Sequence, residues 1–189
     1  VKEKPFLGYV LDNLLKAGDD EFMLVEGFCA GLMEKFLKEY LPPHHNKNKD
    51  CVAQKQGDTF VWCGGGYKVK IVNQFEILGP KKKIYGTACP LMCVKDIVGK
   101  KQFISIYGDN LYSIDDLKRM QKEDNFNYVA GLVREHPEKY GVLITEGDNL
   151  KEIIEKPEHF VGNLINTGLY KFTPDVFKKL PLIKKSSRG

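Results

Sequence analysis

An aspartate at the end of an apolar strand is well placed for metal or phosphate chemistry in this chain. The run Phe103-Ile-Ser-Ile-Tyr107 mixes β-branched and aromatic residues, which predicts a short buried strand. The strand ends at Gly108-Asp109-Asn110. Because ligands of open α/β sheets bind at the carboxyl ends of strands, Asp109 could hold a divalent cation over a phosphate, and Gly108 would let that ligand come close. The alternative is an ordinary turn, since Gly-Asp-Asn is common turn chemistry.

The elements that would position Asp109 alternate between helix and strand. Apolar periodicity predicts helices over 5–17, 30–41, 87–98 and 114–122, and strands over 22–25, 67–72, 103–107, 127–133, 141–145 and 150–155. An extended segment over 163–172 and a short last helix capped by Thr173-Pro174-Asp175 follow. This order predicts an α/β fold of the three-layer αβα, Rossmann-like kind, with a mixed, mostly parallel sheet and right-handed crossovers. The later strands are joined by short turns, so we expect them to pair antiparallel at the edge of this sheet.

Residues 42–66 do not fit the alternation of helix and strand. The segment is polar and long, which is typical of functional or disordered loops, so an insertion loop at the surface is expected. It contains four residues that can bind zinc, namely His44, His45, Cys51 and Cys63. Their spacing matches no standard zinc site, which favours the plain insertion.

Composition excludes several classes of protein. The 189 residues fit one domain over 1–189 that is large enough to bury a core, and the net charge of +4 is mild. Lysines occur singly or in short runs without interleaved aromatic residues, so no nucleic-acid partner is expected. No apolar run approaches the roughly 18 residues of a membrane span, and no leader is visible. Five scattered cysteines without a CxxC pair indicate reduced thiols in a cytoplasmic protein.

Six short motifs follow one another in an order that resembles the sugar-1-phosphate nucleotidylyltransferase family. They are Gln74 after a strand, Gly86-Thr87-Ala88 at a helix start, Tyr107-Gly108-Asp109-Asn110, Tyr140-Gly141-Val142, Ile153-Ile-Glu155-Lys156-Pro157 and Asn163-Leu-Ile-Asn166-Thr-Gly168. The resemblance extends from Lys4 to Gly189 and implies the nucleotide-diphospho-sugar transferase fold. It also implies transfer of a nucleotidyl group from a nucleoside triphosphate, dTTP or UTP, to a sugar 1-phosphate such as glucose 1-phosphate, with Mg²⁺ as cofactor.

The resemblance assigns the catalytic roles to Asp109 and Lys156. Asp109 would hold Mg²⁺ between the two phosphate groups, and Lys156 would pair with the sugar phosphate as a point charge. Glu155 would accept hydrogen bonds from sugar hydroxyls. Neighbouring residues of a strand face opposite sides, so Glu155 and Lys156 can reach one ligand only if the strand end twists or bulges, which Pro157 would assist.

The resemblance divides the remaining binding residues into a group that binds the sugar and a group that binds the nucleotide. By resemblance, Gly141 offers its backbone to the sugar, Asn166 hydrogen-bonds the sugar or its phosphate and Gly168 makes room; Asn110 belongs to the same set. On the nucleotide side Gln74 would read the base, Gly86 and Thr87 would begin the helix beneath the nucleotide, and Gly108 would lie against it. Gln74 and the Gly-Thr pair are twelve residues apart instead of the family's five or so, which leaves Gln74 open.

The resemblance also implies that parts of the family's site lie outside this chain. The family's glycine-rich phosphate loop precedes the stretch matching Lys4-Pro5, and a second metal-binding aspartate follows the stretch matching 186–189. The domain is thus expected to be incomplete at both ends, inactive alone, and prone to homo-oligomerise through exposed apolar sheet edges. The alternative is a catalytically dead regulatory or scaffolding subunit, as in the translation-initiation exchange factors. The retention of Asp109, Glu155, Lys156 and Asn166 favours the enzyme.

Overall fold

The computed structural model describes residues 4–27, 31–45, 52–56, 59–64, 67–80 and 86–183. The chain divides into two compact units, the first made of residues 1–101 and 174–189 and the second of residues 102–173. The described strands form two separate sheets, one in each unit.

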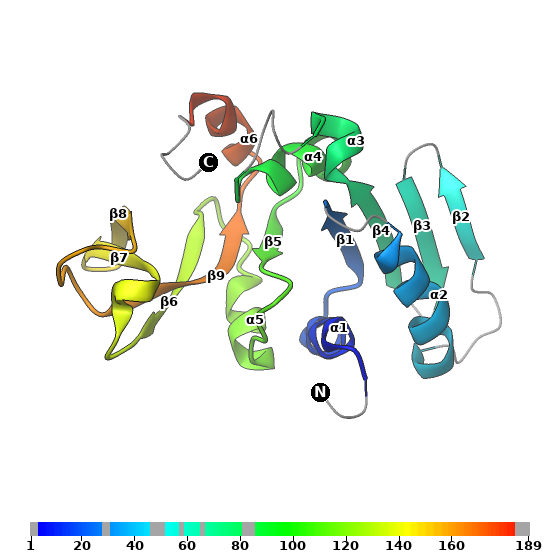
Figure 1. The fold of residues 1–189 in the computed structure, drawn as a ribbon, viewed down its shortest axis with the longest axis horizontal. Coiled ribbons are helices and arrows are strands. Elements are labelled where there is room, and N and C mark those ends of the chain that lie inside the picture. Colours follow the sequence, from blue (N-terminus) through cyan, green and yellow to red (C-terminus); the bar gives the residue numbers. More distant parts are fainter. Residues whose placement is uncertain are drawn as a thin grey trace. The chain divides into compact units, whose positions relative to one another are not determined.

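The first unit is built on a four-stranded sheet in the order β1-β4-β3-β2 (Figure 1). Its elements are α1 (Phe6–Ala17), β1 (Glu21–Glu26), α2 (Leu32–His45), β2 (Val52–Gln56), β3 (Thr59–Gly64), β4 (Tyr67–Asn73), α3 (Gln74–Leu78), α4 (Cys89–Val98), α6 (Val176–Lys179) and a 3-10 turn (Leu180–Leu182). Strands β1 and β4 are parallel, whereas β3 pairs antiparallel with both β4 and β2.

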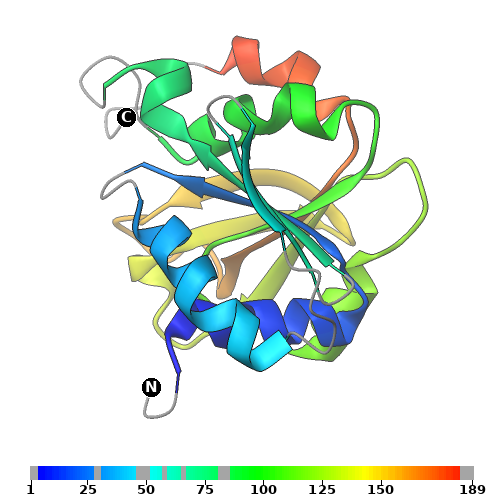
Figure 2. The ribbon, with the colours of Figure 1, turned by 90° about the vertical axis from the view of Figure 1, so that its right-hand side faces the viewer.

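Helices cover both faces of this sheet. In Figure 2, α1 and α2 lie on one side of the strands, and α3, α4 and α6 lie on the other. Helix α4 packs against β1 and β4, which places buried Val94 and Val98 beside the parallel pair. Helix α1 ends as its sequence predicts, because Gly18 adopts φ 107° and its N–H and that of Asp19 bond to the Leu14 carbonyl. The three layers expected from the alternation are therefore present in this unit.

The expectation of an insertion loop over 42–66 is wrong for three stretches of that segment, residues 42–45, 52–56 and 59–64. Helix α2 continues to His45, through Pro42 and Pro43, and residues 52–56 and 59–64 form the antiparallel pair β2 and β3. Thr59-Phe-Val-Trp-Cys63 is rich in β-branched and aromatic residues, which was a strand signal. Strand β2 lies at the edge of the sheet, and edge strands often carry polar and charged residues, which hides the strand pattern in the sequence. Of the four residues that can bind zinc, Cys51 lies outside the described residues, and so do the side chains of His44, His45 and Cys63.

The second unit is built on an antiparallel sheet in which short strands pair with one long strand, β9. Its elements are β5 (Phe103–Ile106), α5 (Ile114–Met120), β6 (Tyr128–Val133), a 3-10 turn (Pro137–Lys139), β7 (Gly141–Glu146), β8 (Asn149–Glu155) and β9 (Leu164–Phe172). The order is β5-β9-β7-β8, and β6 also pairs with β9; all these pairings are antiparallel. Strand β9 therefore joins the strand before Asp109 to the strands that carry the sugar-side motifs. The predicted positions of all five strands are confirmed to within a few residues.

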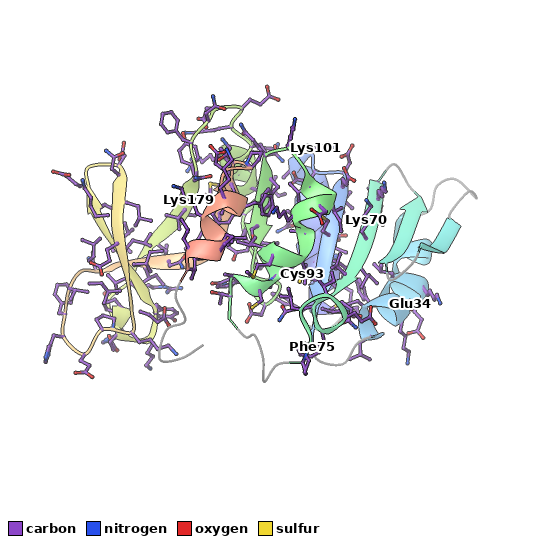
Figure 3. All side chains as sticks on the ribbon, turned by 90° about the horizontal axis from the view of Figure 1, so that it is seen from above. Glu34, Lys70, Phe75, Cys93, Lys101 and Lys179 are labelled. Carbon is purple, nitrogen blue, oxygen red and sulfur yellow. The ribbon has the colours of Figure 1, made fainter. Side chains whose placement is uncertain are left out.

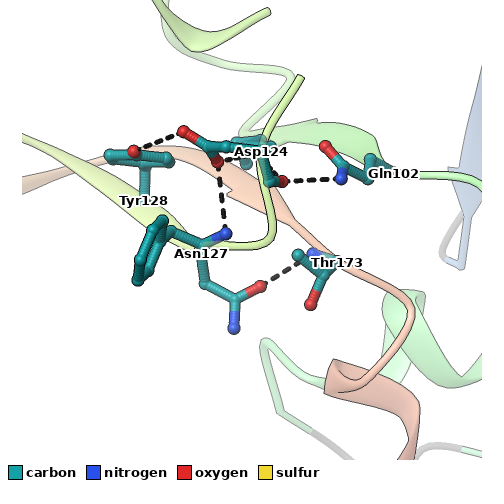
Figure 4. A network of polar contacts seen from close by, with 7 residues as sticks. Gln102, Asp124, Asn127, Tyr128 and Thr173 are labelled. Atoms are coloured by element: carbon teal, nitrogen blue, oxygen red, sulfur yellow. Dashed lines mark hydrogen bonds and ion pairs between the residues drawn. The ribbon is translucent and has the colours of Figure 1, made fainter. Parts of the chain in front are cut away.

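A polar network fastens the segment before β6 to β9 (Figure 4). The buried Lys171 ammonium donates to the Asp124 carboxylate at 2.6 Å and to the Asp124 carbonyl at 2.8 Å. The Tyr128 hydroxyl donates to the other carboxylate oxygen at 2.7 Å, and Gln102 donates to the Asp124 carbonyl. The Asn127 amide oxygen accepts the backbone N–H of Thr173 at 2.7 Å. Every link joins residues of the second unit, so the network stabilises that unit from within.

The Asp124 carboxylate makes the stability of this network depend on pH. Hydrogen bonds from Lys171 and then Tyr128 lower the pKa of Asp124 from 3.8 to about 2. Because the pKa of Asp124 is lower in the folded state than in the unfolded state, the ionised carboxylate stabilises the fold. This contribution is present above the unfolded pKa of 3.8 and is lost as the pH falls towards 2. We expect the melting temperature to fall across that window, and to fall less steeply in Lys171→Met, as measured by circular dichroism. Lys151→Met, which removes a surface partner of Glu146, should keep the wild-type slope.

Candidate functional site

Three residues of the loop after β5 attach Asp109 to the middle of β9. The Tyr107 N–H donates to the Gly168 carbonyl at 3.2 Å, continuing the β5–β9 ladder by one step. The Asn110 amide donates to the Thr167 carbonyl at 3.0 Å, and the Tyr112 hydroxyl donates to the same oxygen at 2.9 Å. Asp109 lies between these anchors with an exposed side chain. Its carboxylate is therefore presented to solvent from a loop held at both ends.

The Tyr107 ring explains why residue 168 is glycine. Gly168 has φ 76°, and a Cβ there would lie 2.7 Å from Cε2 and 2.8 Å from Cγ of Tyr107. Its N–H donates to the Asn166 amide oxygen at 2.9 Å, so the bend also orients that amide. The room that Gly168 was expected to make is occupied by an aromatic ring of the Asp109 loop.

Strands β7, β8 and β9 bring Gly141, Glu155 and Asn166 together. Gly141 is the register partner of Glu155. A Cβ at Gly141 would lie 2.9 Å from the Glu155 carboxylate and 3.7 Å from Cβ of Asn166. The carboxylate thus lies over Gly141, with Cβ of Asn166 also near this glycine, and it can accept hydrogen bonds from hydroxyl groups. The lack of a side chain at Gly141 is what allows Glu155 to lie there.

Lys156 leaves the extended conformation immediately after Glu155. Its φ of 46° is positive, and it is the one non-glycine residue of the described chain with this conformation. Its N–H donates to the Tyr140 carbonyl at 2.9 Å. The strand therefore changes direction at Lys156, at the strand end where a twist or bulge was expected. Backbone strain of this kind in a non-glycine residue is typical of ligand-binding positions.

A continuous series of contacts links the Asp109 loop to Lys156 within the second unit. It passes from the loop to Thr167 and Gly168, then along β9 to Asn166, and across to Gly141 and Glu155. Among the described residues no group of three or more metal-binding side chains occurs. A hard cation at Asp109 would accordingly take its other ligands from water, some of which phosphate oxygens would replace when substrate is bound.

The nucleotide-side residues lie on elements of the first unit, apart from Gly108. Gln74 directly follows strand β4, as expected, and is the first residue of α3. The Asn73 side chain caps this helix by accepting the N–H groups of Phe75 and Glu76. Gly86 and Thr87 precede α4, and the Gly86 carbonyl accepts the N–H of Cys89. Helix α3 packs against α4, so Gln74 lies on a helix that adjoins the one that Gly86 and Thr87 precede. Helix α4 begins at Cys89, two residues later than predicted.

Two tyrosines that the motifs did not indicate belong to the surroundings of the sugar-side residues. The Asn166 amide donates to the Tyr170 hydroxyl at 2.5 Å, and Tyr170 stands edge-on to Tyr107. Burial raises the pKa of Tyr170 and, to a smaller extent, that of Tyr112, so both phenols are protonated at neutral pH. The signals that could have found them are positional. Tyr112 follows Asn110 by two residues, and Tyr170 lies on the same face of β9 as Asn166.

Solved structures share this arrangement of elements. A glucose-1-phosphate thymidylyltransferase from Bacillus anthracis, in complex with sucrose, superposes with a TM-score of 0.70 at 21% identity, over 98% of this chain and 65% of the other. An apo UDP-glucose pyrophosphorylase gives a TM-score of 0.66 at 20% identity, over 97% of this chain and 70% of that one. The fold is therefore the mixed α/β fold of nucleotide-diphospho-sugar transferases, as expected.

The family is identified by sequence. A family model described as nucleotidyl transferase matches residues 2–189, and the chain belongs to that family. It is 28% identical to UTP–glucose-1-phosphate uridylyltransferase AglF of Haloferax volcanii, over 100% of this chain and 68% of the relative. It is also 28% identical to the catalytic subunit beta of mannose-1-phosphate guanylyltransferase of Danio rerio, over 95% of this chain and 44% of the relative. The chain thus spans about two thirds of the length of the first relative and less than half of the length of the second.

Within the described part of the chain, none of the helices combines the length and apolar character that a membrane crossing requires.

Proposed function

We propose that this chain carries the sugar-phosphate side of a nucleotidylyltransferase that joins glucose 1-phosphate to the nucleotidyl group of UTP or dTTP. In this reaction an oxygen of the sugar phosphate attacks the α-phosphorus of the triphosphate, and the bond to the bridging oxygen breaks to release pyrophosphate. The observation that carries the proposal is the series of contacts from the Asp109 loop through Asn166 to Glu155 and Lys156.

Each side chain has a role that its position supports. Glu155 and Asn166, which lie together over Gly141, would hydrogen-bond sugar hydroxyls and fix the orientation of the sugar. Lys156 would neutralise the sugar phosphate, since the left-handed turn changes the direction of the chain at that residue. A Mg²⁺ ion held by Asp109 would lower the repulsion between the two reacting anions. Gln74, Gly86 and Thr87 are proposed for the base and the nucleotide, with Gly108 beside it.

Two further features belong to the proposal. Cys93 is a buried thiol that takes part in no disulfide, which supports a reducing compartment such as the cytoplasm. The rival function is a scaffolding subunit that has the same fold but binds none of these substrates.

Calorimetric titration of the 189-residue chain distinguishes the two functions. We expect heat of binding with glucose 1-phosphate that is reduced in Glu155→Ala and Lys156→Gln. Mannose 1-phosphate, UTP, dTTP and GTP, titrated in the same way, identify the preferred sugar and base. A chain that binds none of the five would be a scaffold, and the proposal would be withdrawn.

The metal role of Asp109 has its own test. Because outer-shell partners of metal ligands already contribute roughly 10–100-fold to metal affinity, Asp109→Asn should raise the dissociation constant for Mn²⁺ at least tenfold. Water-proton relaxation measures that constant without turnover. Asp148→Asn, which removes an exposed carboxylate from the β7–β8 turn, should leave it unchanged. Equal affinities of wild type and Asp109→Asn would exclude Asp109 as a ligand.

A further inference from the structure

One carbonyl oxygen accepts two donors from the loop that carries Asp109. The Asn110 amide and the Tyr112 hydroxyl both donate to the Thr167 carbonyl, at 3.0 and 2.9 Å. A carbonyl oxygen has two lone pairs, so this acceptor is fully used by the loop. The loop is thereby attached on both sides of Asp109, by Tyr107 before it and by Asn110 and Tyr112 after it.

The acceptor itself is held in place. Thr167 donates its hydroxyl to the Ala130 carbonyl on β6 at 2.8 Å. This bond lies where the β6–β9 register shifts, between Val129 and Gly131, so the side chain supplies a link at the irregular step of the ladder. Thr167 also separates Asn166 from Gly168, whose N–H bonds to the Asn166 amide oxygen. A shift of Thr167 would consequently move both the loop and a proposed sugar-binding amide.

The two donors to Thr167 differ in their exposure to water. The Asn110 bond lies at an exposed position, whereas the Tyr112 bond is partly buried. An exposed amide can exchange its partner for water at little cost, but a partly buried phenol loses more when its acceptor is removed. Tyr112 is therefore the stronger of the two attachments.

We infer that Tyr112 is a positioning residue that holds Asp109 for metal binding through the Thr167 carbonyl. Its phenol does not contact the cation; it fixes the distance between the loop and the strand that carries Asn166. This inference rests on the proposed function, in which Asp109 is the metal ligand.

Paramagnetic broadening by Mn²⁺ tests this role in the 189-residue chain. In ¹H–¹⁵N spectra of the wild type, Mn²⁺ should broaden the amide signals of Gly108, Asp109 and Asn110 first. In Tyr112→Phe, which lacks only the hydroxyl, the Mn²⁺ concentration needed for equal broadening should rise about threefold to tenfold, the effect of one partly buried hydrogen bond. Tyr128→Phe is the matched control, because it deletes a phenol that donates at 2.7 Å in the same unit but away from Asp109.

Melting temperatures separate positioning from general stability. Both phenylalanine variants lose one hydrogen bond and should melt at comparably lower temperatures, yet only Tyr112→Phe should need more Mn²⁺. Equal Mn²⁺ requirements in wild type and Tyr112→Phe would overturn the inference and leave the metal role of Asp109 intact. Absence of broadening at residues 108–110 in the wild type would overturn that metal role and the inference with it.

Discussion

Replacing Gly168 by alanine is expected to lower the free energy of unfolding by about 2–5 kcal/mol. The left-handed conformation of residue 168 would cost a non-glycine residue about 1–2 kcal/mol, and forcing a methyl group against the Tyr107 ring adds about 1–3 kcal/mol. Rotating the ring would not relieve the clash, because one of the close atoms is Cγ of Tyr107, which only Cβ separates from the backbone. Urea denaturation of the 189-residue chain, followed by circular dichroism, measures the loss.

Two comparisons separate the steric part from the conformational part. Gly147→Ala is the matched control, because Gly147 also has a positive φ of 55° but its Cβ would meet no atom within 4 Å; it should cost only about 1–2 kcal/mol. In a Tyr107→Ala background, Gly168→Ala should cost a similarly small amount, because the ring is gone. An equal loss with and without the ring would show that Tyr107 does not press on Gly168.

Replacing Lys156 by glycine should stabilise the fold and weaken sugar-phosphate binding at once. Relief of the left-handed strain yields about 1–2 kcal/mol, from which the greater flexibility of glycine in the unfolded chain removes about 0.5–1 kcal/mol. A net gain of up to about 1.5 kcal/mol in the free energy of unfolding is therefore expected. Loss of the ammonium group should raise the dissociation constant of glucose 1-phosphate roughly ten- to a hundredfold, since hydrogen bonds to charged groups contribute about 1.5–3 kcal/mol.

The variant Lys156→Gln separates the effect of backbone strain on stability from the effect of the lost charge on binding. It keeps a Cβ, and with it the strain, but lacks the charge, so its unfolding free energy should match the wild type while its binding is as weak as that of Lys156→Gly. Calorimetry with glucose 1-phosphate and urea denaturation provide the two readouts. Full binding by either variant would refute the role of Lys156, and a less stable Lys156→Gly would refute the strain.

Local rules predicted the elements of this fold where they agreed with tertiary packing. Helix α1 ends at Gly18 as expected, because the glycine accepts a conformation that closes the helix. The segment 42–66 was misjudged because β2 is an edge strand without an apolar face and because α2 continues through a Pro-Pro pair that ordinarily ends a helix. The strand alternation also predicted more parallel pairing than the described strands show, since only β1 and β4 pair in that way.

The candidate site was predictable as a set of motifs but not as a set of contacts. Motif order indicated Asp109, Glu155 and Asn166, and the need for a twist at Lys156 followed from strand geometry alone. The attachment of Tyr112 to Thr167 joins residues 55 positions apart, and the pairing of Lys171 with Asp124 spans 47 positions. Such partners are set by strand register in three dimensions, which no local pattern in the sequence encodes.

The cysteines of α4 supply a natural reporter of helix detachment. Cys89 and Cys93 lie one turn apart and are buried, and Figure 3 labels Cys93 on this helix. Burial, with the neighbouring Cys89, raises the pKa of Cys93 to about 11. Alkylating reagents attack the thiolate, so at neutral pH this sulfur should be inert while α4 covers β1 and β4. Its rate of labelling by iodoacetamide, followed by mass spectrometry of the α4 peptide, would then time the transient openings of that helix without any engineered probe.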